Sequence, residues 1–367
     1  MQRLLALVTI VTLWGAACAP AARPAAPAGA GDARPRASAA PLAGAGALSA
    51  GASPTASASA PAAPAAASPV PRTVRIAMPA ASLSLLPLKI ADERGLFRAE
   101  GITVEWVPLA PELGATAILA GEVGYTTTPS TVASAAAQGA PLRIFLFSAS
   151  KLQHQIVGRP ELRSMADLAG KRVAVFRQGD LTAFEVRWAL DHFGVPDATV
   201  LSVGRETDRL AAVLSGAADA TVLPVPADIV AERQGLRVLL AVGDVLEVPL
   251  AGLGTNEDRL RGSPEEIAGL VRGAIRGVQY LRDPAHADDV VALIADWVGI
   301  SPEEARVALD RVRGTYAPGG LPTDTQLQAF LTMMRATGAV GDDVTPDQIS
   351  DFRITRQVAA DLGVGAP

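Results

Sequence analysis

The 367-residue chain contains one cysteine, three histidines and three lysines, and only 4% of its residues are aromatic. The single cysteine, Cys18, excludes an intramolecular disulfide framework and any zinc or iron–sulfur site built from several cysteines. The histidines lie far apart in the sequence, so we expect neither a metal site nor a cofactor. With 32 basic and 37 acidic residues the net charge is −5, which argues against a broadly basic surface for nucleic acid.

Long apolar runs are absent except at the N-terminus, where residues 4–14 follow Arg3. Such a run, as a helix, rises about 16 Å, well short of the hydrocarbon core of a bilayer, so residues 1–18 are typical of a signal peptide. The run ends in Gly-Ala-Ala-Cys, which resembles a bacterial lipoprotein cleavage box with Cys18 as the lipidated residue. We therefore expect an exported lipoprotein, anchored in the cell membrane through Cys18 and facing the periplasm or the cell exterior. Ordinary cleavage after Ala17 is the alternative.

A second segment with an unusual composition follows the signal. Residues 19–71 consist almost entirely of alanine, proline, serine and glycine. They lack the large apolar side chains whose burial offsets chain entropy, and their prolines and glycines interrupt helices. We expect residues 19–71 to be a disordered linker between the anchor and a folded part that begins at Arg72.

The folded part has alternating strand-like and helix-like patterns as far as about residue 256, which is typical of an α/β protein. Beyond that point the patterns are helical only. The predicted strands cover residues 74–78, 102–106, 123–127, 142–147, 155–158, 172–176, 199–203, 220–223 and 238–242. The predicted helices among them cover residues 85–94, 112–120, 183–193, 208–214 and 227–233.

Capping boxes, in which a hydroxyl residue precedes Glu or Gln by three positions, mark several helix starts. One begins at Thr182 in the alternating part. In the C-terminal part they begin at Ser263, Ser301, Thr323 and Thr345. After Ser263, apolar residues fall on one face at helical spacing. These residues are Ile267, Leu270, Val271, Ala274, Ile275, Val278 and Leu281.

Several short motifs occur in a definite order along the folded part. They read LPLKIADERGLF at residues 86–97, EGITV at 100–104, AGEV at 120–123, DLAGKRVAV at 167–175 and LSGAADA at 214–220. Together they resemble the bacterial ABC-importer substrate-binding proteins of the nitrate, sulfonate, taurine and thiamine-pyrimidine type. The resemblance covers nearly all of residues 72–367, although Gly124 stands where the family usually has Asp.

The resemblance implies a type II periplasmic-binding-protein fold, with two α/β lobes joined by two crossover segments and a helical C-terminal region. We place lobe 1 at residues 72–152 plus 249–367, and lobe 2 at residues 153–248. The crossovers then fall near residues 150–153 and 245–249. The resemblance also implies a small-molecule ligand between the lobes and an ABC permease as the partner in the membrane. We expect a monomer with no nucleic-acid partner.

Ligands of open α/β sheets bind outside the carboxyl ends of strands, where helix N-termini leave N–H groups unpaired. Four strand-to-helix junctions can be read here, at residues 79–86, 126–131, 178–182 and 224–228. Their hydroxyls and N–H donors favour an anionic oxygen group. The candidate ligand-binding residues, with one from the first crossover, are Ser82, Ser84, Leu85, Thr126, Thr127, Thr128, Ser130, Gln153, Gln178, Gly179, Asp180, Thr182, Pro224, Pro226 and Asp228.

Two other interpretations of these residues stay open. The hydroxyls of Thr128, Ser130 and Thr182 are equally typical of plain helix capping. The carboxylates of Asp180 and Asp228 would favour a cationic or hydrogen-bonding ligand instead of an anion.

The leading hypothesis is an extracytoplasmic solute-binding protein of an ABC importer, which captures a small sulfonate- or carboxylate-like molecule and delivers it to a permease. The alternatives are a pyrimidine or thiamine-precursor ligand, and a sensory receptor with the same fold. We do not expect an enzyme, because no Ser–His–Asp order, HExxH motif or Gly-Lys phosphate loop is evident.

Overall fold

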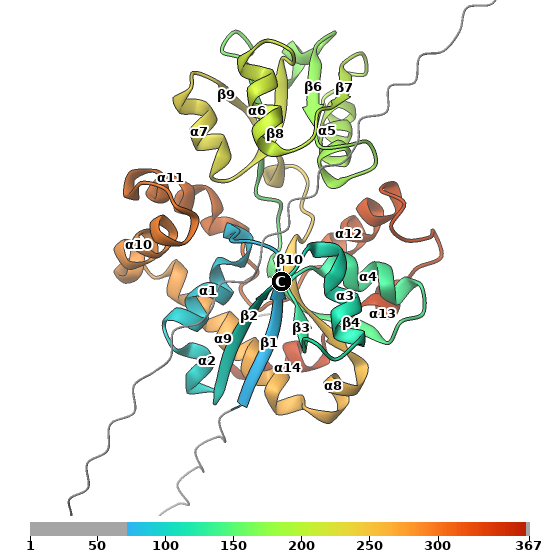
Figure 1. Cartoon of the computed structure of the whole chain (residues 1–367), viewed down its shortest axis with the longest axis vertical. Coiled ribbons are helices and arrows are strands. Elements are labelled where there is room, and N and C mark those ends of the chain that lie inside the picture. Colours follow the sequence, from blue (N-terminus) through green and yellow to red (C-terminus); the bar gives the residue numbers. More distant parts are fainter. Residues whose placement is uncertain (1–71, 365–367) are drawn as a thin grey trace, which may run out of the picture. The chain divides into compact units, whose positions relative to one another are not determined.

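The computed structural model describes residues 72–364, which contain two five-stranded sheets with helices against their faces (Figure 1). Sheet A consists of β1 (Arg72–Met78), β2 (Ile102–Pro108), β3 (Tyr125–Thr126), β4 (Leu142–Ala149) and β10 (Ala251–Asn256). Its order is β2-β1-β3-β10-β4. β1 is parallel to both β2 and β3, whereas β10 is antiparallel to β3 and β4.

Sheet B repeats this arrangement with five other strands. They are β5 (His154–Gly158), β6 (Arg172–Val175), β7 (Thr199–Ser202), β8 (Ala220–Pro224) and β9 (Arg237–Ala241). The order is β7-β6-β8-β5-β9, with β6 parallel to β7 and β8, and β5 antiparallel to β8 and β9. The fourth strand in the order of each sheet, β10 in sheet A and β5 in sheet B, is therefore antiparallel to both of its neighbours.

Helices follow most strands and then dominate the C-terminal part. Sheet B is flanked by α5 (Leu181–His192), α6 (Glu206–Leu214) and α7 (Ala227–Arg233) (Figure 1). The helices between strands of sheet A are α1 (Leu86–Glu93), α2 (Leu96–Ala99), α3 (Gly114–Leu119) and α4 (Pro129–Ala137). The C-terminal helices are α8 (Glu257–Gly262), α9 (Pro264–Arg282), α10 (Ala287–Val298), α11 (Pro302–Val312), α12 (Asp324–Ala336), α13 (Pro346–Ile349) and α14 (Arg353–Asp361).

The sequence predicted every strand except β10, and in the α/β part it predicted the helices α1, α3, α5, α6 and α7 but gave no range for α2 or α4. Two elements differ in extent. The strand expected over residues 123–127 is only the two-residue β3, and the helix expected over residues 112–120 starts as a 3-10 turn (Pro111–Leu113) before α3. The apolar face predicted after Ser263 is confirmed, because all seven of its residues are buried on α9.

The missed strand β10 has the sequence AGLGTN, which contains two glycines and gives little strand signal. The structure explains the glycines. A Cβ atom at Gly252 would lie 2.0 Å from the backbone oxygen of Leu146 in β4, and one at Gly254 would lie 2.5 Å from Cγ2 of Val132 in α4. The close approach of β4 and α4 therefore excludes the side chains that would have marked a strand.

The chain passes between the two sheets twice. The first passage follows β4, and the second follows a 3-10 turn (Val242–Asp244) and leads into β10. The ammonium group of Lys151 in the first passage contacts the carboxylate of Glu247 in the second, so an ion pair joins the two passages.

The predicted caps are confirmed at three C-terminal helices and wrong at one. Ser301 and Thr323 form capping boxes with Glu304 and Gln326, and the Gln348 side chain accepts a hydrogen bond from the backbone of Thr345. Ser263 does not cap α9. It also ends α8, and its backbone (φ −135°, ψ 50°) and its N–H bond to the Arg259 oxygen belong to that helix end.

Two negative findings apply to the described residues. No helix among them is long and apolar enough to cross a membrane. Within residues 72–364 no group of three His, Cys, Asp or Glu side chains could hold a metal ion. The predicted signal peptide, the lipidation site Cys18 and the linker over residues 19–71 lie outside the described residues.

Candidate functional site

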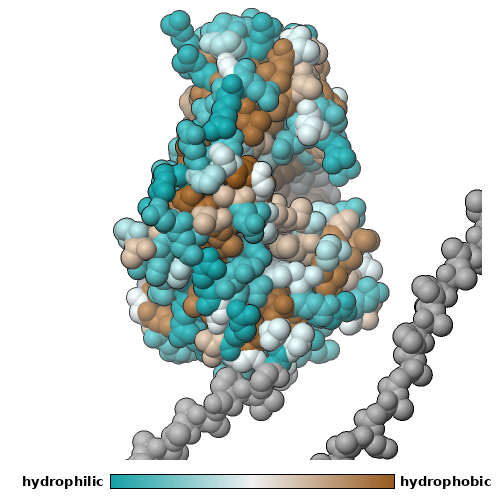
Figure 2. All heavy atoms as spheres, turned by 60° about the vertical axis from the view of Figure 1, so that its left-hand side comes forward, coloured by the Kyte–Doolittle hydropathy of each residue, from teal (hydrophilic) through white to brown (hydrophobic). Residues whose placement is uncertain are grey.

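The carboxyl ends of the parallel strands bring the predicted junctions together in pairs. β1 and β3 are neighbours in sheet A, and β6 and β8 are neighbours in sheet B. The chain after β1 leads to β2 on one side, whereas the chain after β3 leads to β4 on the other side. Open α/β sheets hold ligands at such a reversal of strand order. Two surface hollows involve these junctions, and Figure 2 shows the surface recessed at mid-height with hydrophobic atoms along the margin.

The first hollow has a volume of about 480 Å³ and is lined from both sheets. The loop after β1 contributes Ser82, and the β8–α7 junction contributes Pro224 and Pro226. The first turn of α6 adds Glu206, and the C-terminal end of α10 adds Trp297. The wall is therefore largely apolar, with one carboxylate and two hydroxyl residues.

The second hollow has a volume of about 360 Å³ and also takes residues from both sheets. Ser130 comes from the first turn of α4, and Gly179 and Asp180 come from the β6–α5 junction. Both passages between the sheets contribute, with Leu152 from the first and Val248 from the second. Phe330, Met333 and Met334 of α12 form an apolar wall, and Arg177 and Asp180 are the charged residues of the lining.

Only part of the predicted site lines these two hollows. The predicted residues that do are Ser82, Pro224 and Pro226 in the first, and Ser130, Gly179 and Asp180 in the second. Gln178 lines a separate hollow of about 410 Å³ beside Trp188 on α5. Its side chain donates to the Val200 oxygen and accepts from Arg187, so it is directed along sheet B.

Six predicted residues are buried inside the protein: Ser84, Leu85, Thr126, Thr127, Gln153 and Asp228. Their polar atoms bind neighbouring protein groups. Thr127 Oγ1 donates to the Ala77 oxygen at 3.1 Å, and Gln153 Nε2 donates to Thr315 Oγ1 at 2.7 Å. Ser84 Oγ lies 2.9 Å from Ser82 Oγ. These groups shape the loops around the hollows.

The two remaining hydroxyls stand at helix starts. Thr128 is the N-cap of α4, with Pro129 in the first helical turn, but its side chain makes no capping bond. The capping box predicted at Thr182 is wrong, because the N-cap of α5 is Asp180. Asp180 Oδ1 accepts from the Ala183 N–H at 3.0 Å and from Thr182 Oγ1 at 2.8 Å. A carboxylate thus already occupies the N-terminus of α5, where the sequence suggested a place for an anion.

Asp228 is fully buried at the start of α7 and contacts the guanidinium group of Arg311 on α11. Arg311 also contacts Glu232, and Arg233 of α7 forms a second ion pair with Glu304 at 2.8 Å. Burial raises the pKa of Asp228 to about 6, against the opposing effect of Arg311. Asp228 therefore holds α7 against α11.

Sequence reasoning missed Glu206 and Trp297 in the first hollow. β7 is parallel to β6, so its junction with α6 lies at the same edge of sheet B as the predicted junctions. That junction contains Glu206, and including it would have found this residue. Trp297 ends a helix of the C-terminal part, and no sequence pattern connects it to the junctions.

A group of charged residues lies within sheet B and its helices. His154 Nδ1 is 2.6 Å from Oε1 of Glu185, whose side chain is fully buried in α5. Burial opposes protonation of His154, but the charge and the hydrogen bond of Glu185 together outweigh burial and raise the pKa of His154. Arg209 of α6 is also buried and donates to the backbone oxygens of Gly204 and Val222. The side chains of His154 and Arg209 are therefore both bound to other groups of the protein.

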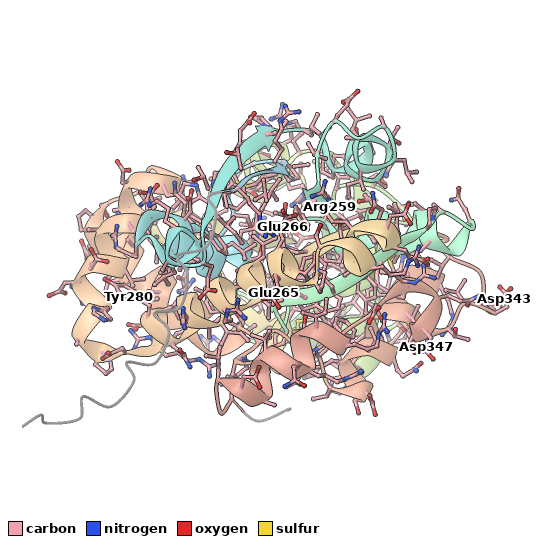
Figure 3. The ribbon with its side chains drawn as sticks, turned by 90° about the horizontal axis from the view of Figure 1, so that it is seen from below. Arg259, Glu265, Glu266, Tyr280, Asp343 and Asp347 are labelled. Carbon is pink, nitrogen blue, oxygen red and sulfur yellow. The ribbon has the colours of Figure 1, made fainter. Side chains whose placement is uncertain are left out.

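A second buried polar group lies in sheet A and its helices. Figure 3 shows Arg259 and Glu266 next to each other at the start of α9. Glu266 Oε1 accepts from Arg259 Nη1 at 2.8 Å and from the Tyr125 hydroxyl at 2.5 Å. Burial raises the pKa of Tyr125 far above its ordinary value. This group ties α8 and α9 to β3 and lines neither hollow.

Several solved structures share the architecture of this chain and define its fold. A putative sulfonate ABC transporter protein, the periplasmic sulfonate-binding protein SsuA from Methylobacillus flagellatus, is 16% identical and covers 81% of this chain and 96% of its own, with a TM-score of 0.67. The periplasmic nitrate-binding protein NrtA from Synechocystis is 16% identical and covers 80% of this chain and 89% of its own, with a TM-score of 0.61. A Candida albicans protein described as having the generic periplasmic binding protein structural fold is 15% identical and covers 79% of this chain and 95% of its own, with a TM-score of 0.56. The expected periplasmic-binding-protein fold with two lobes is confirmed.

A family model gives the more particular assignment. The family described as NMT1/THI5 like matches residues 83–287, which is more than half of the chain. The chain belongs to this family. No curated protein matches it in sequence.

Proposed function

We propose that this protein is the solute-binding component of an ABC importer, which takes up a small molecule between its two lobes and presents it to a membrane permease. Membership of the NMT1/THI5-like family and the fold shared with the sulfonate- and nitrate-binding proteins support this role. The observation that carries the proposal is the first hollow, because its walls come from the strand ends of both sheets.

The proposed site consists of the junction residues around the two hollows. Ser82, Ser130, Gly179, Asp180, Pro224 and Pro226 would contact the solute directly. Behind them, Ser84, Leu85, Thr126, Thr127, Thr128, Gln153, Gln178, Thr182 and Asp228 would hold the loops or meet the solute after closure. Lobe 1 would be residues 72–152 plus 249–367, and lobe 2 would be residues 153–248.

Solute capture requires only that the closed arrangement of the lobes makes more contacts with the solute than the open one. The two passages between the sheets are the proposed hinge, and the Lys151–Glu247 ion pair would make them move together. We propose binding without reaction, so the solute leaves with all its bonds intact. Catalytic turnover of a bound solute would favour the enzyme alternative.

We further propose that residues 1–18 direct export and that Cys18 carries a lipid, with residues 19–71 as the tether. The protein would then act as a monomer at the outer face of the cell membrane.

Binding to the full chain is tested by thermal denaturation with a panel of sulfonates, nitrate, carboxylates, amines and pyrimidines. A true solute at 100 times its dissociation constant adds about 2.7 kcal/mol to the free energy of unfolding. Small-angle scattering should show a smaller radius of gyration with the same solute. The variant Ala81→Trp, which fills the first hollow, should lose both effects, whereas Ala120→Trp at the exposed end of α3 should keep them. A stabilising solute that leaves the scattering unchanged would contradict capture by closure.

A further inference from the structure

Among residues 72–364, Glu206 is the only charged residue that lines the first hollow. It lies in the first turn of α6, at the junction that follows β7. Its side chain is partly buried, and within residues 72–364 it makes neither a hydrogen bond nor an ion pair. The Glu206 carboxylate has lost part of its water without gaining a partner among these residues, so the hollow lacks a complementary group.

The nearest cations do not supply that group. Arg209, one turn along α6, directs its guanidinium to the oxygens of Gly204 and Val222. His154 contacts Glu185. Burial raises the pKa of Glu206, while Arg209 and His154 act in the opposite direction and do not restore the ordinary value. The negative potential at Glu206 is therefore only partly balanced by the protein.

Stabilisation of the α6 N-terminus does not account for this burial. An acidic residue in the first turn interacts favourably with the helix dipole, and an exposed one does so without loss of water. Asp208 lies in the same turn, is exposed and supplies that interaction. The position of Glu206 inside a largely apolar hollow needs another explanation.

The rest of the lining is suited to an apolar body. Pro224, Val225 and Pro226 form one wall, and Leu210 and Val298 lie around the same hollow. Trp297 adds an aromatic side chain, and the ammonium group of Lys89 lies 6.0 Å from the centre of its ring. Aromatic faces attract cations, which adds to the effect of Glu206.

We propose that the first hollow binds a solute with a protonated nitrogen on a compact apolar body, with the nitrogen at Glu206 and the body against Trp297 and the β8–α7 prolines. The inference rests on the proposed solute-binding function and names the class of solute. It differs from the anion that helix N-termini suggested. The N-terminus of α5 carries Asp180, and no cationic side chain from the described part of the chain lines the first hollow.

The test uses three probes of similar size and different charge: benzylamine, benzyl alcohol and benzoate. Binding to the full chain is measured by calorimetry, with thermal denaturation as a second readout. We expect benzylamine to bind at millimolar concentration or below, and to bind more tightly as the pH rises and Glu206 ionises. Benzyl alcohol and benzoate should bind about tenfold or more weakly, because neither gives a charged hydrogen bond to Glu206.

Two variants separate a site from general electrostatic attraction. Glu206→Gln keeps the shape of the side chain and should weaken benzylamine binding about tenfold or more and remove its pH dependence. Glu265→Gln changes the net charge equally on the exposed part of α9 seen in Figure 3, and should bind benzylamine like the natural chain. Melting temperatures without probe show whether each variant is folded.

Equal benzylamine binding by the natural chain and Glu206→Gln would overturn the inference, as would preferential binding of benzoate or no binding of benzylamine. These outcomes leave the proposed function intact if another solute of the panel stabilises the chain and makes it more compact. If no solute of the panel does so, the proposed function fails with it.

Discussion

The Glu185 carboxylate is fully buried, and one of its oxygens lies 2.6 Å from Nδ1 of His154. Its other oxygen, Oε2, has no hydrogen-bond partner among the described residues. The pair links the first strand after the passage between the sheets to α5. Because a buried carboxylate without a cation is costly, the charge state of His154 determines how well sheet B is stabilised.

The variant Glu185→Gln should reverse the pH dependence that His154 contributes. In the natural chain the pKa of His154 is raised, so its contribution to stability is complete below pH 6.5 and is lost as the pH rises through the higher folded value. Without the Glu185 carboxylate, burial and the charge of Arg209 lower the pKa of His154 against the smaller opposing effect of Glu206, so stability is gained as the pH rises toward 6.5. Denaturant unfolding between pH 5 and 8 measures the difference between the two proteins.

Glu161→Gln provides the control for this prediction. Glu161 lies on the surface with its side chain 57% exposed and pairs with Arg159. The free energy of unfolding of Glu161→Gln should depend on pH as it does in the natural chain. If Glu185→Gln also follows the natural profile, His154 does not titrate against Glu185 and the prediction is wrong.

The roles of single side chains could be predicted only where residues close by in the sequence determine them. Ser301 and Thr323 cap their helices as expected because each box is completed within four residues. The cap at Thr182 was wrong because Asp180 lies two residues earlier and its carboxylate reaches the same helix turn. Glu206 and Trp297 meet in one hollow although 91 residues separate them, and no local pattern records that contact.

Among the elements, α9 is held to α1 by an unusually close contact of backbones. A Cβ atom at Gly277 would lie 2.2 Å from the backbone oxygen of Pro87 in α1, whereas one at Gly273 would lie 2.4 Å from a ring carbon of Phe97 in α2. The neighbouring face of α9 contributes buried residues such as Val278 and Leu281. Gly277 therefore allows α9 and α1 to approach closely, and Gly273 makes room for the Phe97 ring of α2.

Gly277→Ala should therefore lower the free energy of unfolding by about 1–3 kcal/mol, since the methyl group must push α1 away from α9. The loss should appear although alanine favours a helix by about 1 kcal/mol relative to glycine. The matched change Gly262→Ala, at the end of α8, meets nothing within 4 Å and should not destabilise the chain. Urea unfolding of both variants measures the difference. Equal free energies of unfolding for Gly277→Ala and Gly262→Ala would show that α1 can move away from α9 without loss of stability.

The elements also show why one strand escaped prediction. Most strands could be predicted because β-branched and apolar residues are concentrated in them, as in Val74–Met78 of β1 and throughout β8. β10 carries glycine where β4 and α4 come close, so the contacts that make it a strand removed its signal. β10 is a strand because of its packing against β4 and α4, and the local sequence gives no sign of those contacts.

For the whole molecule, the contact between α7 and α11 is the largest set of ion pairs joining sheet B helices to the C-terminal helices. Arg311 contacts both Asp228 and Glu232, and Arg233 contacts Glu303 and Glu304. Any movement of the two sheets relative to one another must turn about this contact or break it. The resemblance predicted two lobes from ordered motifs, but nothing in the sequence placed α11 against α7.

Arg311→Met should leave Asp228 buried without a cation and lower stability by about 3–5 kcal/mol. The loss should be smaller at pH 5 than at pH 8, because the pKa of Asp228 is raised to about 6 and a protonated carboxyl tolerates burial. We also expect a larger radius of gyration by small-angle scattering. Arg306→Met on the same helix removes only an exposed pair with Asp288 and should change stability by less than about 1 kcal/mol. A scattering profile shared by both variants would show that the α7–α11 contact does not limit the separation of the sheets.

The antiparallel strand β10 has a consequence for the order in which the protein is made. β4 ends at Ala149 and β10 begins at Ala251, so the ribosome completes all of sheet B before it supplies the strand that fits between β3 and β4. At a translation rate of about 5–20 residues per second, that interval lasts roughly 5–20 s. During it the edges of β3 and β4 stay open to pairing with other nascent chains, and a message truncated within the interval yields a product that cannot close its first sheet.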